Sequence, residues 1–234
     1  MGVMPYKTST GSGGDWTLVV PLKPLTRAKS RLSASVGESA RARLALAFAQ
    51  DTVDAALRCP LVRAVVVVTD DVRAGRVLAE AGARVVPDVV GGGLNAALRH
   101  GAARARSELA AGAVAALNAD LPALRAIELS RVLVAAATAP RAFLADAAGT
   151  GTTLLAAGPE VALRPAFGPR SRRRHLASGA VELPLPDVPG ARQDVDTGED
   201  LLAARELGVG GHTLGALGAV GDVDAVRASG VSPG

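Results

Sequence analysis

With 234 residues and a net charge of +4, the chain is long enough for one sizeable domain, and its positive balance favours a polyanionic ligand. Aromatic residues make up only 2% of it, too few for a surface on which nucleic-acid bases stack, so we expect a nucleotide and not a nucleic acid as its partner. Its single cysteine excludes an internal disulfide, and no apolar run reaches the roughly 18 residues of a bilayer span, so we expect a cytoplasmic protein with no membrane partner.

The first half of the chain alternates apolar runs with amphipathic stretches. We expect a disordered polar tail over residues 1–15. Strands are predicted at Trp16–Pro21, Arg63–Thr69, Arg84–Val86 and Gly112–Leu117. Helices are predicted at Ser39–Leu57, Val72–Ala81, Leu94–Leu109 and Ala126–Ala137. This alternation is typical of βαβ units around a mostly parallel sheet.

The pattern changes after Pro140. Further strands are predicted at Arg141–Ala147, Thr152–Ala157 and Val181–Leu185, and further helices ending near Gly179 and spanning Gly198–Leu207. Thr197 is the expected N-cap of that last helix, and residues 210–234 are expected to form a flexible C-terminal segment. Residues 16–209 are therefore expected to fold as a single α/β domain of three layers, α/β/α, around a mostly parallel central sheet.

Two acidic segments far apart in the chain carry the clearest chemical signal. The strand Gly112–Leu117 leads into Asp120, and Pro122 prevents the strand from continuing. Open α/β sheets bind ligands at the carboxyl ends of their strands, where Asp120 is expected. Asp194 and Asp196 form the second segment. Because Mg²⁺ takes few protein ligands beside water and substrate phosphates, the sequence predicts a magnesium site made by Asp120 with Asp194 or Asp196.

A basic loop follows the first strand and carries Lys23, Arg27, Lys29 and Arg31. Lysine offers phosphate oxygens a point charge and arginine a planar fork, so this loop could hold a triphosphate. A solvated basic loop without a ligand is an equal alternative. The spacings of a Walker loop and of a dinucleotide-binding G-x-G-x-x-G are both absent, which argues against P-loop enzymes and dehydrogenases.

Two glycine-rich turns could contact anions. Gly91–Gly93 precedes a predicted helix whose first amides could bind an anion. Asn95 could read a base edge there or simply cap the helix. Gly149–Thr153 could form a nest for a phosphate or carboxylate, or an ordinary hairpin turn.

The segment Phe167–His175 favours a binding role over a purely structural one. Ser171 stands where a helix would begin and arginines follow at once, a combination suited to a small acid that bears a phosphate. The three histidines show neither metal-ligand spacing nor a nucleophile partner, so we expect each to be a surface or packing residue.

These motifs occur in one order along the chain: the basic loop, Asn118–Pro122, Gly149–Thr152, Phe167–Pro169 and Asp194–Thr197. In that order they resemble the guanylyltransferases of coenzyme F-420 biosynthesis, which belong to the glycosyltransferase-A-like nucleotidyltransferases. The likeness runs from about Trp16 to Val209. It implies a single nucleotidyltransferase domain with a Rossmann-like fold of the nucleotide-diphospho-sugar-transferase type.

The resemblance implies a reaction. GMP would pass from GTP to phosphoenolpyruvate or 2-phospho-L-lactate, with release of pyrophosphate and with Mg²⁺ as cofactor. The Ala-, Arg- and Gly-rich composition is typical of a GC-rich bacterial genome, which favours phosphoenolpyruvate. Because the product supplies a deazaflavin carrier, the deazaflavin-transferase that uses it next is a candidate partner.

The resemblance also implies roles for individual residues. It implies that the catalytic residues are Asp120, Lys23 and Lys29 and that the metal ligands are Asp120, Asp194 and Asp196. The acid would be bound by Thr152, Gly168 and Ser171, and the nucleotide by Lys23, Arg27, Lys29 and Asn95. A molybdopterin guanylyl- or cytidylyltransferase is the nearest alternative, although the glycine-rich loop usual in those enzymes is absent from Leu22–Arg31. A non-catalytic nucleotide-binding protein is the other alternative.

Overall fold

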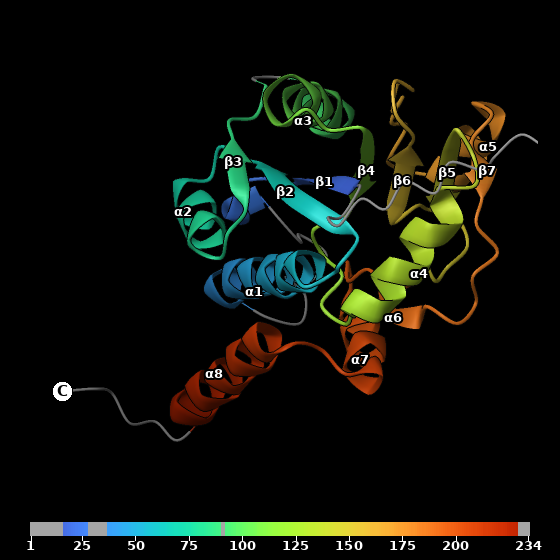
Figure 1. Ribbon diagram of the computed structural model, residues 1–234. Helices are drawn as coiled ribbons and strands as arrows, with labels where there is room; N and C mark the ends of the chain where they lie inside the picture. Colours follow the sequence, from blue (N-terminus) through green and yellow to red (C-terminus); the bar gives the residue numbers. More distant parts are fainter. Residues whose placement is uncertain (1–15, 28–36, 90–91, 229–234) are drawn as a thin grey trace, which may run out of the picture.

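A computed structural model describes residues 16–27, 37–89 and 92–228 (Figure 1). Its strands are β1 (Trp16–Pro21), β2 (Val62–Val68), β3 (Arg84–Val86), β4 (Ala113–Leu117), β5 (Arg141–Leu144), β6 (Leu154–Ala157) and β7 (Val181–Glu182). Its helices are the 3-10 helix η1 (Leu25–Arg27) and the α-helices α1 (Glu38–Leu57), α2 (Val72–Glu80), α3 (Gly93–Leu109), α4 (Ala126–Ala136), α5 (Ser171–Ala177), α6 (Pro189–Arg192), α7 (Gly198–Leu207) and α8 (Gly211–Ala228).

The described strands form one sheet in the order β3-β2-β1-β4-β6-β5-β7. Only β6 among them runs antiparallel to its neighbours, β4 and β5. The carboxyl end of β4 and the start of β6 therefore lie at the same edge of the sheet, together with the carboxyl end of β5. The predicted mostly parallel sheet is confirmed, and this edge is where the chain places its polar loops.

Helices cover both faces of the sheet, which confirms the three-layer α/β/α architecture (Figure 1). Leu18 and Val20 of β1 point into the core shared with α1, α2 and α4. Val19, between them, packs on the opposite face against α3. The α3 helix approaches closely because Gly101 has no side chain; a Cβ there would lie 2.5 Å from Val19. Small residues thus replace aromatic bulk in this core.

Several element boundaries differ from those predicted. The strands expected at Arg141–Ala147, Thr152–Ala157 and Val181–Leu185 are shortened to β5, β6 and β7. The Gly149–Gly151 turn separates β5 from β6, and Pro184, which cannot donate a ladder hydrogen bond, follows β7. The short helices η1 and α6 were not predicted. None of the helices in the described ranges is long and apolar enough to cross a membrane.

The sequence predicts no helix beyond Leu207, and this is wrong, because α8 follows. Its glycine-rich sequence has low intrinsic helix propensity. The helix begins against α1, where the Asp51 carboxylate accepts the backbone N–H groups of His212 (3.1 Å) and Thr213 (2.9 Å). Gly210 lies so close to Asp51 that a Cβ would overlap it. A cap supplied by a distant part of the chain therefore starts a helix that local propensity does not favour.

Replacing Asp51 by alanine tests this cap. The change leaves two N–H groups at a partly buried helix start without an acceptor, so we expect the free energy of unfolding in urea to fall by about 1–3 kcal/mol. Asp54→Ala is the control: it removes the partly exposed contact of Asp54 with His212 (3.3 Å) and should cost less than about 1 kcal/mol. Equal losses in the two variants would contradict a capping role for Asp51.

Candidate active site

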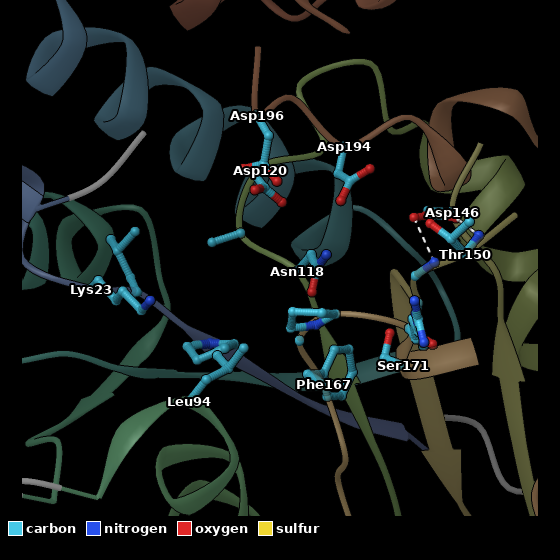
Figure 2. A pocket seen from close by; sticks show the side chains of 18 of the residues that line it. Lys23, Leu94, Asn118, Asp120, Asp146, Thr150, Phe167, Ser171, Asp194 and Asp196 are labelled. Atoms are coloured by element: carbon cyan, nitrogen blue, oxygen red, sulfur yellow. Dashed lines mark hydrogen bonds between the residues drawn. The ribbon is translucent and has the colours of Figure 1, made fainter. Parts of the chain in front are cut away.

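A cavity of about 650 Å³ lies at the sheet edge where β1 and β4 end and β6 begins (Figure 2). Four segments, one pair and three single residues line it: residues 21–23, 118–120, 150–152 and 167–171, the pair Asp194 and Asp196, and Ala45, Leu94 and Asp146. Most of these residues follow a strand or precede a helix. The site is thus built from loops on a rigid sheet.

Asp120 is held in place through its two neighbours. The hydroxyl of Thr52, fully buried on α1, accepts the N–H of Leu121 (3.0 Å). The same hydroxyl lies 3.3 Å from the carbonyl of Ala119 and donates to its own helix at Phe48 (2.8 Å). The loop after β4 is therefore anchored on both sides of Asp120, so the position of its backbone is well defined.

The second acidic segment meets the first, as predicted. The N–H of Val195 donates to the carbonyl of Asp120 (3.1 Å), and the Val195 side chain is fully buried. Asp194 and Asp196 flank this anchor, and both line the cavity with Asp120 (Figure 2). Asp194 and Asp196 lie in the loop between α6 and α7, not on a strand.

The three carboxylates do not by themselves form a closed metal site. Within the described ranges, no group of three or more His, Cys, Asp or Glu side chains is arranged to hold a metal ion. This donor set is compatible with Mg²⁺, which usually keeps several waters and completes its shell with substrate phosphates. Metal binding by Asp120, Asp194 and Asp196 stays a prediction.

The glycine-rich turn after β5 is closed by its own carboxylate. Asp146 accepts the N–H groups of Thr150 (2.9 Å) and Gly151 (2.8 Å). These two amides are the ones that a phosphate nest would need, so the structure favours the alternative of an ordinary turn. Asp146 itself lines the cavity and was missed. An Asp three residues before a Gly-Thr-Gly turn is the signal that could have found it.

Gly168 and Ser171 form the entry to α5. Gly168 has a φ of +112°, which only glycine adopts readily, and its carbonyl accepts the N–H of Ser171 (3.0 Å). Ser171 is 2% exposed and its side chain points toward the cavity (Figure 2). Arginines stand on both sides of Ser171. Arg170 lines the cavity, whereas Arg172 forms an ion pair with Glu182 (2.9 Å).

Thr152 lies at the same wall and contacts a buried histidine. Its hydroxyl oxygen is 2.9 Å from Nδ1 of His175, and the N–H of Ala166 donates to Nε2 of that ring (3.0 Å). Burial, followed by the nearby charges of Arg141 and Arg174, lowers the pKa of His175 to about 4. The ring is therefore neutral near pH 7. The expected packing role of His175 is confirmed, but the ring also makes polar contacts.

The residues predicted to bind the nucleotide are only partly brought together. Lys23 is exposed and lines the cavity opposite Ser171 (Figure 2). Arg27 ends the 3-10 helix η1, and Lys29 lies outside the described residues. Asn95 does not line the cavity: its side chain donates to the carbonyl of Phe167 (3.0 Å) and accepts its N–H (2.8 Å). This pairing gives Asn95 a structural task, and its contact with guanine stays a prediction.

Solved structures show what fold this chain shares. A provisionally named nucleotide-diphospho-sugar transferase from Desulfovibrio desulfuricans G20 matches with a TM-score of 0.58 and 16% identity, over 80% of this chain and 85% of that one. A nucleotidyl transferase from Methanothermobacter matches with a TM-score of 0.55 and 23% identity, over 83% and 97%. The fold is therefore of the nucleotide-diphospho-sugar-transferase type.

Sequence relatives are much closer. A Streptomyces scabiei protein named phosphoenolpyruvate guanylyltransferase is 66% identical over 205 residues, 86% of this chain and 95% of that protein. A protein of the same name from Streptomyces coelicolor is 65% identical over 198 residues, 85% and 93% of the two chains. The family model described as guanylyl transferase CofC like matches residues 16–214. The chain thus belongs to the guanylyl transferase CofC-like family.

Proposed function

We propose that the protein transfers GMP from GTP to phosphoenolpyruvate, releasing pyrophosphate and forming enolpyruvyl-diphospho-5'-guanosine for coenzyme F-420 biosynthesis. The observation that carries this proposal is the joining of Asp120 to the Asp194–Asp196 loop at one edge of the cavity. The name shared by relatives at 65–66% identity supports the choice of substrates. Membership of the family argues against a molybdopterin enzyme.

The cavity has two ends with different chemistry (Figure 2). Lys23 and Leu94 lie at one end, where a cation and an apolar side chain suit a nucleotide. Thr150 and Ser171 lie at the other end, where hydroxyls suit a small phosphorylated acid. The carboxylates of Asp120 and Asp194 lie between the two. We therefore assign GTP to the Lys23 end, with its α-phosphate directed toward the carboxylates, and the acid to the Ser171 end.

The charge of the described lining supports a divalent cation. Four carboxylates face the cavity (Asp120, Asp146, Asp194 and Asp196), against the two cations Lys23 and Arg170. Both substrates are themselves polyanions, so their binding there needs further positive charge. We propose that Asp120, with Asp194 or Asp196, holds Mg²⁺. When bound, the ion would neutralise charge on the reacting phosphates.

The transfer needs no protein nucleophile. A phosphate oxygen of the acid attacks the α-phosphorus of GTP in line, forming the new P–O bond as the bond to pyrophosphate breaks. The chain contributes alignment, which can supply a large part of the rate enhancement. Ser171, Thr152 and the backbone at Gly168 would hold the acid, and Lys23 would balance negative charge as pyrophosphate leaves.

A substrate panel tests this assignment directly. GTP, CTP and ATP are each offered with phosphoenolpyruvate, 2-phospho-L-lactate and 3-phosphoglycerate, and pyrophosphate is followed. Because the diphosphate product is expected to be unstable, the deazaflavin-transferase that consumes it should be added in parallel. We expect turnover with GTP and phosphoenolpyruvate. If turnover is faster with 2-phospho-L-lactate, that acid is the acceptor instead. If no pair of substrates releases pyrophosphate, the protein binds nucleotides without catalysing the transfer.

The Asp120→Asn variant tests the metal ligand. The change keeps the size of the side chain but removes its charge, so we expect pyrophosphate release to fall about 100-fold or more. Asp187→Asn is a matched control, since it removes the same charge from an exposed ion pair with Arg131, outside the cavity lining. Its turnover should equal that of the wild type. Unchanged turnover in Asp120→Asn would rule out the metal-binding role.

Removal of divalent metal tests the cofactor. We expect pyrophosphate release to stop when the wild-type enzyme is treated with a chelator, and to return when excess Mg²⁺ is added. Circular dichroism should stay the same throughout, because the described fold has no structural metal cluster among its resolved side chains. Full activity in the chelator would exclude metal from the reaction.

The Ser171→Ala variant tests the acid-binding end. Loss of a hydroxyl that binds a charged phosphate or carboxylate oxygen should raise the KM for phosphoenolpyruvate about 10-fold. The KM for GTP should change much less, because GTP is assigned to the opposite end of the cavity. Ser107→Ala, which removes an exposed hydroxyl from α3, serves as the control. An equal rise in both KM values would place Ser171 elsewhere in the reaction.

A further inference from the structure

His175 sits behind the acid-binding wall and is fully buried. Its ring packs against Phe143 and Phe167, with ring centroids 5.6 and 5.2 Å away. Both of its nitrogens have partners: Thr152 at Nδ1 (2.9 Å) and the N–H of Ala166 at Nε2 (3.0 Å). One ring therefore joins the turn that carries Thr152 to the loop that precedes Gly168.

The contact with Ala166 determines which nitrogen carries the proton. A backbone N–H can only donate, so Nε2 must accept and has no hydrogen. In a neutral imidazole the hydrogen is then on Nδ1. The opposite tautomer would set two N–H groups against each other at 3.0 Å. Nδ1–H therefore donates to the hydroxyl oxygen of Thr152.

The direction of the Thr152 hydroxyl follows. Its oxygen accepts from His175, so its own hydrogen must point away from the ring. Thr152 is 4% exposed and lines the cavity, so a ligand bound there can accept that hydrogen. A hydroxyl turned in this way can donate to an anionic oxygen, because its hydrogen cannot point at the ring while the bond from His175 is kept.

We infer that His175 is a positioning residue, which acts through Thr152 by fixing its hydroxyl as a donor to a phosphate or carboxylate oxygen of the acid substrate. The inference rests on the proposed function and deepens it. It also explains why a histidine outside the cavity lining is kept neutral and desolvated: a charged ring would carry a hydrogen on Nε2 facing the Ala166 N–H. His175 is not itself a catalytic residue, because it does not touch the cavity.

Two substitutions separate this role from simple packing. In His175→Asn the side-chain amide can occupy the position of Nδ1 and still donate to Thr152, but the acceptor for Ala166 is lost. In His175→Gln the amide reaches the position of Nε2 and can accept from Ala166, but the donor to Thr152 is lost. Each variant thus keeps one of the two hydrogen bonds and gives up most of the ring packing.

We expect His175→Gln to raise the KM for phosphoenolpyruvate about 10-fold with little change in the KM for GTP, and His175→Asn to raise it less than about 3-fold. Thr152→Val should resemble His175→Gln. In the double variant with Thr152→Val, His175→Gln should add little further, because the two residues act as one unit. Equal effects of Asn and Gln, or additive effects in the double variant, would overturn the inference.

A spectroscopic measurement on the wild-type protein does not depend on how the variants fold. With imidazole nitrogens labelled by ¹⁵N, His175 should show a protonated Nδ1 and an unprotonated Nε2 near pH 7. The chain has three histidines, so replacing His100 and His212, which lie outside the cavity lining, leaves the signal of His175 alone. A protonated Nε2 would overturn the inference. Failure of the wild type to use any of the acids would instead count against the proposed function.

Discussion

The arrangement of the cavity depends on a single backbone hydrogen bond, from Val195 to the carbonyl of Asp120. It brings together two loops, those that carry Asp120 and Asp194, which no strand pairing joins. Thr52 makes this possible by holding the loop on either side of Asp120 from the buried face of α1. Burial of the Val195 side chain anchors the other partner.

The opposite wall of the cavity is held by a different set of contacts. Because β6 runs antiparallel, the turn before it reaches the same edge as Asp120. Arg192 secures that turn, since its guanidinium donates to the carbonyls of Ala145 (3.2 Å) and Asp146 (3.0 Å). The loop that carries Asp194 is therefore tied to both walls. A change in the position of this loop would affect the metal-binding and acid-binding ends together.

The regular elements could be predicted because their signals are local. The successive valines of β2 predict a strand from the local sequence alone, and they are buried on both faces of the sheet. Thr197 was predicted as a helix cap and makes a capping box with Asp200. Helix α8 could not be predicted, because its glycine-rich sequence disfavours a helix and its cap, Asp51, lies about 160 positions away. The pairing of Asn95 with Phe167 could not be predicted for the same reason, because the two residues are remote in the chain.

The sequence alone determined the class of fold and the edge of the sheet where the cavity lies, together with Asp120, Asp194, Asp196, Lys23, Thr152, Gly168 and Ser171 of its lining. These follow from periodicity and from the residue types that end each strand, which are properties of short segments. Only the tertiary structure decided that Asp146 closes its own turn, that Asn95 holds a loop, and that His175 orients Thr152. Each of those assignments depends on which hydrogen-bond partner a polar group meets, and that partner comes from a part of the chain that folding, not sequence order, brings near.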